Sequence, residues 1–307
     1  MKGKAISLWN VLKRTFEEFS ADNCPRMAAA LAYYTVFSLA PLLVLVVAIA
    51  GTIAGRVIEP SRVREEVGAQ LERTMGPRGA DQIGAMLENA SQPGTGGLAT
   101  VISILGLLVG ATAAMSQLQA SLNDAWRVKP DPNQPWIKHF LLKRLLTVLM
   151  VLVIVALLLV SLAFSTLVSS LGNWLPPVSA ETSKALLLTR HTTADLLIFT
   201  LLFAAVFKLL PDARIAWRDV WLGSLVTAIL FTGGKFALGY YLGSKNMQST
   251  LGAVGSVGLV LVWVYYSALI LLLGAEFTQV WACKFGKQVR PKKGAVLVEQ
   301  SPKDAIK

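Results

Sequence analysis

Charged side chains inside otherwise apolar blocks are the residues of this sequence best suited to chemistry. Lys235 and Glu276 fall within such blocks, and Asp195 opens another. A charge at the bilayer centre costs about 2.5–3.5 kcal/mol on insertion scales, so such residues mark functional sites by default. Two interpretations stay open: the charges line a polar path, or Lys235 snorkels outward and Glu276 holds helix ends through an ion pair.

The partners of these charges are predicted from their depth in the membrane. Counting the rise along antiparallel helices puts Lys235 and Glu276 roughly 13–24 Å apart in depth, so the two should not pair with each other. Asp195 is the better candidate partner for Lys235. The basic residues nearest to the level of Glu276 are Arg26, Lys208 and Arg218.

A proline in the first apolar block is a second candidate feature. Pro41 removes the hydrogen bond to the Phe37 carbonyl and predicts a kink. Tyr34 and Ser38 share its helix face. Such a kinked, hydroxyl-bearing face is typical of a hinge or a substrate path, and simple helix packing is the alternative.

Small residues at four-residue spacing predict close helix contacts. Gly106 and Gly110 show this spacing in one apolar block, and Gly239 and Gly243 repeat it in another. Glycine lets two backbones approach closely within a membrane. We expect packing within one chain rather than a dimer contact.

The combinations of residues that enzymes use are missing from the sequence. The only histidines, His139 and His191, are predicted to lie on opposite sides of the membrane. No Cys/His cluster with metal-ligand spacing, no nucleophile elbow and no phosphate-binding loop is present. We therefore predict that the protein is not an enzyme and uses no metal and no cofactor.

Composition and length predict an all-α bundle that crosses a membrane. The 307 residues are 54% hydrophobic and 15% charged, whereas soluble domains carry about 25% charged residues. A bilayer core needs about 20 consecutive apolar residues per helix. Six blocks meet this requirement, at residues 27–54, 98–115, 145–171, 194–210, 220–241 and 254–282.

The segments outside this six-helix domain (27–282) differ in character. Residues 1–26 contain an amphipathic stretch that either lies in the membrane interface or packs on the protein's own cytoplasmic face. The loop 55–97 is predicted to form two short helices, 60–75 and 80–91, as a cap or as an inert connector. Residues 283–307 form a basic tail.

The distribution of basic residues predicts the orientation. Of the 29 Lys and Arg residues, 20 fall on the side of the two termini, 8 on the other side, and Lys235 within a span. This bias places both termini in the cytoplasm. There Cys24 and Cys283 should stay reduced, and the net charge of +11 should attract anionic lipid headgroups. No soluble module for nucleic acid is indicated.

Three segments carry a family resemblance. They are Cys24-Pro25-Arg26 followed by AAALAYYTVFSLAPLL, the stretch LLPDARIAWRDVWLGSLVTAILFTGGKFALGYYLG at 209–243, and the block 251–282 with WVYYSALILLLGAEFTQV. They resemble the YihY/BrkB family of bacterial inner-membrane proteins. The resemblance implies six membrane helices and an activity that is not established, and it includes Lys235 and Glu276 within its motifs.

Family labels such as ribonuclease BN and virulence factor suggest competing functions. A metal-dependent nuclease needs clustered His and Asp ligands. This sequence lacks such a cluster, so we reject the ribonuclease label. Our leading hypothesis is transport of a lipid or amphiphile of the cell envelope. The alternative is a membrane scaffold or regulator that binds partners through its basic cytoplasmic face.

Overall fold

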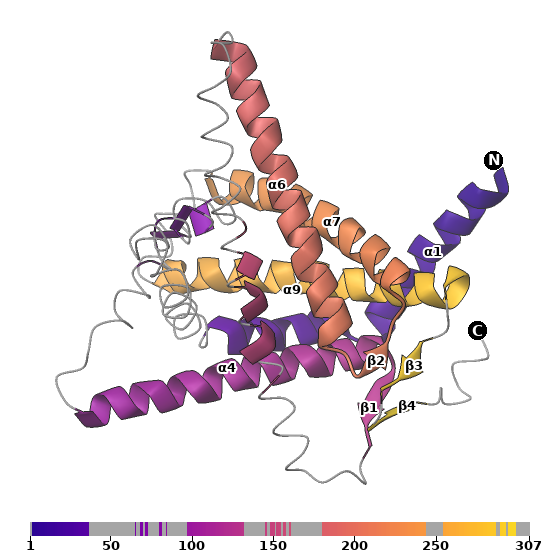
Figure 1. Ribbon diagram of the computed structural model, residues 1–307, viewed down its shortest axis with the longest axis horizontal. Helices are drawn as coiled ribbons and strands as arrows, with labels where there is room; N and C mark the ends of the chain where they lie inside the picture. Colours follow the sequence, from indigo (N-terminus) through magenta and orange to yellow (C-terminus); the bar gives the residue numbers. More distant parts are fainter. Residues whose placement is uncertain are drawn as a thin grey trace.

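The protein is built of long helices, as the computed structural model shows (Figure 1). The structure describes residues 2–36, 97–131, 180–243, 254–286, 289–292 and 294–298, together with separate positions within 65–84 and 145–160. Residues 24–36 are helical. The other long helices are α1 (Lys2–Ala21), α4 (Gly97–Ala125), α6 (Ala180–Leu209), α7 (Trp217–Gly243) and α9 (Val254–Phe285).

Among the residues that the structure describes, two helices are long and apolar enough to cross a membrane by length and composition. They are Trp217–Leu238 in α7 and Val260–Phe285 in α9, which fall in the fifth and sixth predicted spans. The described positions between 145 and 160 and within 65–84 are helical, in agreement with the predicted third span and outer-loop helices. The rest of these segments and residues 37–54 lie outside the described residues.

Helices α4 and α6 extend well past the predicted spans. The prediction ended one block at 115, whereas α4 continues to Ala125. The other block was predicted from 194, whereas α6 begins at Ala180. Hydropathy marks where lipid ends, but a helix continues as long as its backbone hydrogen bonds do, so polar residues such as Gln117 and Asn123 extend α4 beyond its apolar part.

Aromatic side chains join α6, α7 and α9 in the main core. Phe199 and Phe203 of α6 lie one turn apart, and their rings contact Phe231 of α7 edge-to-face at 4.7 and 5.7 Å. Phe231 in turn contacts Trp263 of α9 at 5.9 Å. Edge-to-face pairs of this kind stabilise by about 0.5–1.5 kcal/mol beyond area burial.

Two reciprocal glycine–threonine contacts bring α7 and α9 together. A Cβ added at Gly223 would lie 1.8 Å from Oγ1 of Thr278, and one added at Gly274 would lie 1.9 Å from Oγ1 of Thr227. Each threonine hydroxyl donates to the carbonyl of the glycine four residues before it, at 2.7 Å for Thr227 and 2.5 Å for Thr278. The hydroxyls thus keep their hydrogen bonds within an apolar interface.

Residues 24–36 run antiparallel along α9. Cys24 and Ala28 cluster with Leu272 near one end, and Val36 clusters with Val260 further along. The apolar residues at 24, 27, 28 and 31 recur at helical spacing, so this helix presents a continuous apolar face to α9.

Four short strands close the end of the bundle where α4, α6 and α9 end and α7 begins. Strand β1 (Val128–Pro130) pairs antiparallel with β4 (Ala295–Leu297). Strand β2 (Ala213–Arg214) pairs with β3 (Arg290–Pro291). The all-α prediction is corrected to this extent: the segment after α9 returns as two strands because β1 and β2 leave backbone groups free to pair.

Candidate functional site

Lys235 and Asp195 form a buried ion pair between α7 and α6. The Nζ atom lies 2.7 Å from Oδ2, and the side chains are 9% and 6% exposed. Lys235 is 18 residues from the start of α7 and Asp195 is 14 residues from the end of α6, so the pair lies about 21–27 Å from the strand end.

Aromatic rings surround the ammonium group of this pair. The Nζ atom of Lys235 lies 5.7 Å from the ring of Phe199 and 5.5 Å from that of Phe236. Phe199 also packs into the core through Phe231, whereas Phe236 is exposed. The cation is therefore held between the core and the outer surface, where ring faces attract it.

A second cluster forms around Glu276, which is 1% exposed in α9. Cys24 Sγ donates to Oε1 of Glu276 at 3.7 Å. The side chain of Asp22 also hydrogen-bonds to Glu276, and burial raises the pKa of Asp22 above its ordinary value. Burial, followed by the nearby charge of Glu276, also raises the pKa of the Cys24 thiol. The arrangement favours a protonated carboxyl group at Asp22 and a protonated, unreactive thiol at Cys24.

The sequence-based alternative of an ion pair for Glu276 is not what the structure shows among the residues it describes. Arg26 is exposed. Lys208 donates to the Ile215 carbonyl and lies 5.0 Å from the ring of Trp217. The partners of Glu276 instead come from the turn before residues 24–36, which brings Asp22 against α9.

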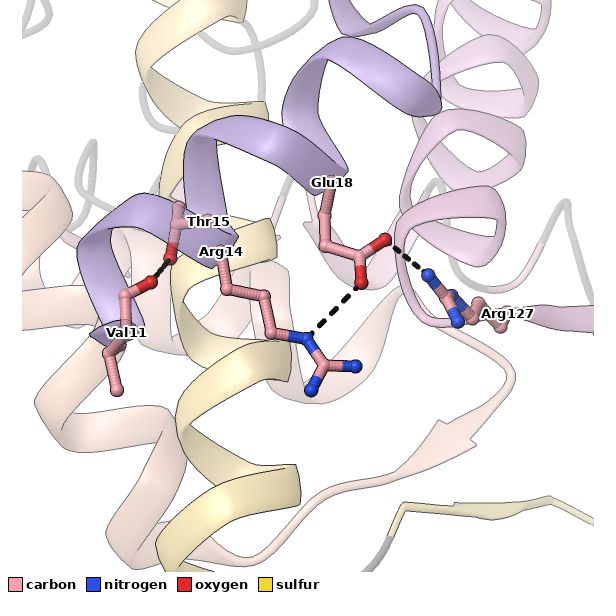
Figure 2. Close-up of polar contacts among 5 residues, drawn as sticks. All are labelled: Val11, Arg14, Thr15, Glu18 and Arg127. Carbon is pink, nitrogen blue, oxygen red and sulfur yellow. Dashed lines mark hydrogen bonds and ion pairs between the residues drawn. The ribbon is translucent and has the colours of Figure 1, made fainter. Parts of the chain in front are cut away.

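Glu18 links α1 to the end of α4 beside this cluster. Its carboxylate forms an ion pair with Arg127 and accepts from Nε of Arg14 at 3.4 Å (Figure 2). Arg127 adopts a φ of 53° just after α4, in the left-handed region that a non-glycine residue rarely occupies. Its carbonyl accepts from the backbone of Val298 at 2.9 Å, so one residue joins three parts of the chain.

A buried polar network surrounds Asp212, and it was not predicted from the sequence. Asn123 donates to Asp212 Oδ2 and accepts from the Asp212 backbone N–H, both at 2.8 Å. Gln119 Nε2 adds weaker bonds at 3.3 and 3.4 Å. The backbone N–H of Lys292 donates to the Asp212 carbonyl at 2.8 Å. The sequence signal for this network is the pair Gln119 and Asn123, which lie four residues apart and therefore on one face of α4.

The remaining predicted residues are those of the Tyr34 helix face and the two glycine pairs. Tyr34 is exposed and contacts Tyr33 edge-to-face at 5.6 Å. Ser38 and Pro41 lie outside the described residues. Gly106 and Gly110 are in α4, and Gly239 and Gly243 are in α7. The close α7–α9 approach described above uses Gly223 and Gly274 instead.

No metal-binding group emerges from the parts of the chain that the structure describes. Within them, no set of three His, Cys, Asp or Glu residues is arranged to hold a metal ion. Cys24 and Cys283 are both free thiols. The polar clusters found in the described residues are the buried Lys235–Asp195 ion pair and the networks around Glu276, Glu18 and Asp212.

The fold is that of a helical protein in which two described helices meet the length and composition of a membrane span. The sequence profile of the family described as Virulence factor BrkB matches residues 15–296. The chain therefore belongs to this family, as the resemblance indicated.

Curated relatives are named as membrane proteins. A "UPF0761 membrane protein" of Alkalilimnicola ehrlichii is 29% identical over 270 residues, covering 87% of this chain and 57% of the relative. One of Azotobacter vinelandii is 28% identical, with 89% and 62% covered, and one of Alteromonas mediterranea is 28% identical, with 92% and 90% covered. The chain thus spans about three-fifths of the length of the first two relatives. No solved structure matches the chain.

Proposed function

We propose that this protein moves an anionic lipid or amphiphile between the leaflets of the bacterial inner membrane. The buried Lys235–Asp195 pair carries the proposal. Burying two charged side chains in an apolar interior costs free energy. A pair of apolar side chains of similar size often stabilises a fold at least as well as a buried ion pair. A pair retained there is best explained by a use for the charge.

The geometry suggests how that use would work. Asp195 forms the ion pair with Lys235 while no substrate is present, and an anionic headgroup would compete with the Asp195 carboxylate for the Lys235 ammonium group. The exposed ring of Phe236 beside the ammonium group offers apolar contact for the adjoining chain. A lipid-like substrate fits this mixture of one cation and aromatic surface better than a small ion does.

The proposal includes six membrane spans with both termini in the cytoplasm. Supporting it, strands β1 to β4 gather the segment after α4, the α6–α7 connection and the segment after α9 at one end. The packing of α1 on the last turns of α9 adds the N-terminal segment to that end. These are the four segments to which the basic-residue bias assigns the cytoplasmic side.

Reconstituted vesicles test the translocation. Phosphatidylglycerol carrying a fluorophore that dithionite quenches would report lipid movement, with the phosphatidylcholine analogue as comparison. We expect the protein to accelerate movement of the anionic probe, Lys235→Ala to abolish most of this, and Lys235→Arg to retain part. Lys284→Ala, an exposed lysine at the end of α9, is the matched control. Wild-type protein that moves neither probe would refute the proposal.

One observation favours the alternative scaffold function. Strands β1 to β3 and the residue after β3 place basic side chains at the strand end, namely Lys129, Arg214, Arg290 and Lys292. Truncation can test it only if the strands are left intact. Removing 299–307 spares β4, whereas removing 287–307 also deletes β3 and β4. Both truncations thus leave the basic side chains untested or remove the strands, so substitutions are the direct test. Loss of function in cells with Lys129→Gln and Arg290→Gln, both at exposed positions, together with a silent Lys235→Ala, would favour a scaffold.

A further inference from the structure

Helix α1 crosses α9 rather than extending the helix that follows it. Along residues 24–36, Cys24 lies beside Glu276. A straight extension of that helix would put Val11 about 20 Å beyond Cys24. Instead Val11 packs against Phe277, the residue next to Glu276. Because α9 is a candidate span, a helix that crosses it at this level lies near the plane of the membrane surface.

The turn between the two helices fixes this direction. Asn23 adopts a φ of 53°. Its backbone N–H donates to the Ser20 carbonyl at 3.1 Å, and its own carbonyl accepts from Met27 at 3.2 Å. Asparagine tolerates the left-handed region better than most residues, so the chain changes direction within two residues. In Figure 1, α1 runs obliquely across the end of α9.

Three faces divide α1. Val11 and Thr15 are 0% and 2% exposed and form the face that meets the bundle, where the Thr15 hydroxyl donates to the Val11 carbonyl at 2.8 Å (Figure 2). At 100° per residue, the next face is apolar and exposed, and the third is polar. The exposed apolar side chains are Leu8, Trp9, Leu12 and Phe16, and the polar ones are Asn10, Lys13, Arg14 and Glu17.

Aromatic side chains on the neighbouring helices mark the level of α1 as an interface. Trp281 of α9 packs against the cluster that contains Val11, and its ring lies 4.6 Å from that of exposed Phe285. On α7, Trp217 and Trp221 are exposed in the first turns. Tryptophan gathers where headgroups meet acyl chains.

We propose that the exposed apolar face of α1 is a docking surface for the anionic lipids of the leaflet at the strand end. Leu8, Trp9, Leu12 and Phe16 enter the acyl region, and the basic residues of the same helix contact the headgroups. Lys13 is well exposed, and its pairing with exposed Glu17 is long at 3.7 Å, which leaves the ammonium group available to a phosphate. Lys2 and Lys4 add positive charge at the start of the helix.

The charge argues for lipid rather than a second copy of the chain. A second α1 placed on the apolar face would add its own net positive charge, because four basic residues outnumber Glu17 and Glu18 in each helix. An anionic headgroup instead complements this charge, as in interfacial helices with a basic polar face. This inference is independent of lipid translocation: α1 would dock in the same way in a transporter or in a scaffold.

Spin labels on the full-length protein in vesicles test the docking. With Cys283→Ser, labels are introduced by Leu12→Cys or Trp9→Cys on the apolar face and by Glu17→Cys on the polar face as the matched control. Buried Cys24 is retained, because its inaccessible thiol does not compete for label. Accessibility to oxygen and to a water-soluble nickel chelate is measured in phosphatidylcholine with and without phosphatidylglycerol.

We expect labels at positions 9 and 12 to favour oxygen and the label at 17 to favour the nickel chelate. Adding phosphatidylglycerol should deepen positions 9 and 12, and Lys13→Gln should reduce that change. Three results would overturn the proposal: nickel access at 9 and 12 equal to that at 17, depths that do not depend on phosphatidylglycerol, or disulfide cross-linking between copies through Leu12→Cys.

Discussion

Asn123 and Asp212, 89 residues apart in the chain, hydrogen-bond each other twice, side chain to side chain and side chain to backbone, both at 2.8 Å. The pair fastens the end of α4 to the connection between α6 and α7. Because Asp212 is buried, its carboxylate depends on these donors in place of water.

Replacing Asn123 with alanine should therefore destabilise the fold. The change leaves the carboxylate of Asp212 with only the weaker Gln119 bonds at 3.3 and 3.4 Å among the described residues. An unsatisfied buried polar group costs about 1–3 kcal/mol. Thermal unfolding in detergent measures it, with Asp124→Ala at the exposed next position as the control. Equal melting temperatures for the two variants would contradict the role assigned to Asn123.

Alanine at either close-contact glycine should disrupt the α7–α9 interface. A Cβ at Gly223 would lie 1.8 Å from Thr278 Oγ1, and one at Gly274 would lie 1.9 Å from Thr227 Oγ1. Overpacking of this kind costs about 1–3 kcal/mol. At Gly233 in α7, an added Cβ meets nothing within 4 Å. Gly233→Ala should leave the melting temperature unchanged or raise it slightly.

Single and double substitutions of the buried ion pair should behave differently. Lys235→Met or Asp195→Leu alone leaves one buried charge without its partner, at a cost of about 3–5 kcal/mol. The double variant replaces both charges by apolar groups and should recover much of that stability while remaining inactive in lipid translocation. A double variant as unstable as the two single ones combined would show that the pair does not act as a unit.

Asp22 should make the stability of the fold depend on pH. Burial raises its pKa from the ordinary value of 3.8, so the folded state binds its proton more tightly than the unfolded state. Stability from this group is then highest below about pH 4 and falls as the pH rises through the raised value. Asp22→Asn cannot ionise and should raise the melting temperature at pH 7 but not at pH 4. Glu17→Gln, an exposed change on α1, should show no such difference.

Several features could be predicted from the sequence because they depend on local pattern. Apolar length identified α7 and α9, where the candidate spans fall. Helical spacing identified α1 as amphipathic, and the structure shows one face packed on α9 and another exposed. The position of α1 in the membrane interface stays a prediction. Depth along two helices singled out Asp195 as the better partner for Lys235, and the structure contains that contact.

Other features depend on geometry that no local pattern encodes. Glu276 meets Asp22 and Cys24 because Asn23 turns the chain there, and only the direction of that turn decides which residues reach α9. Strands β2 and β3 are two residues each, too short for alternation to mark them. Gly223 and Gly274 stand without a second glycine at four-residue spacing, so their close contacts became visible only once the helices were placed.

The pairing of β3 and β4 with strands far earlier in the chain has a consequence for biogenesis. Their partners β1 and β2 precede α7 and α9, so both strands wait unpaired while α7 and α9 are synthesised. The β1–β4 and β2–β3 pairs can form only after residues 290–297 have left the ribosome. Chains that stop before residue 290 would lack both β3 and β4, and the edges of β1 and β2 would stay unpaired.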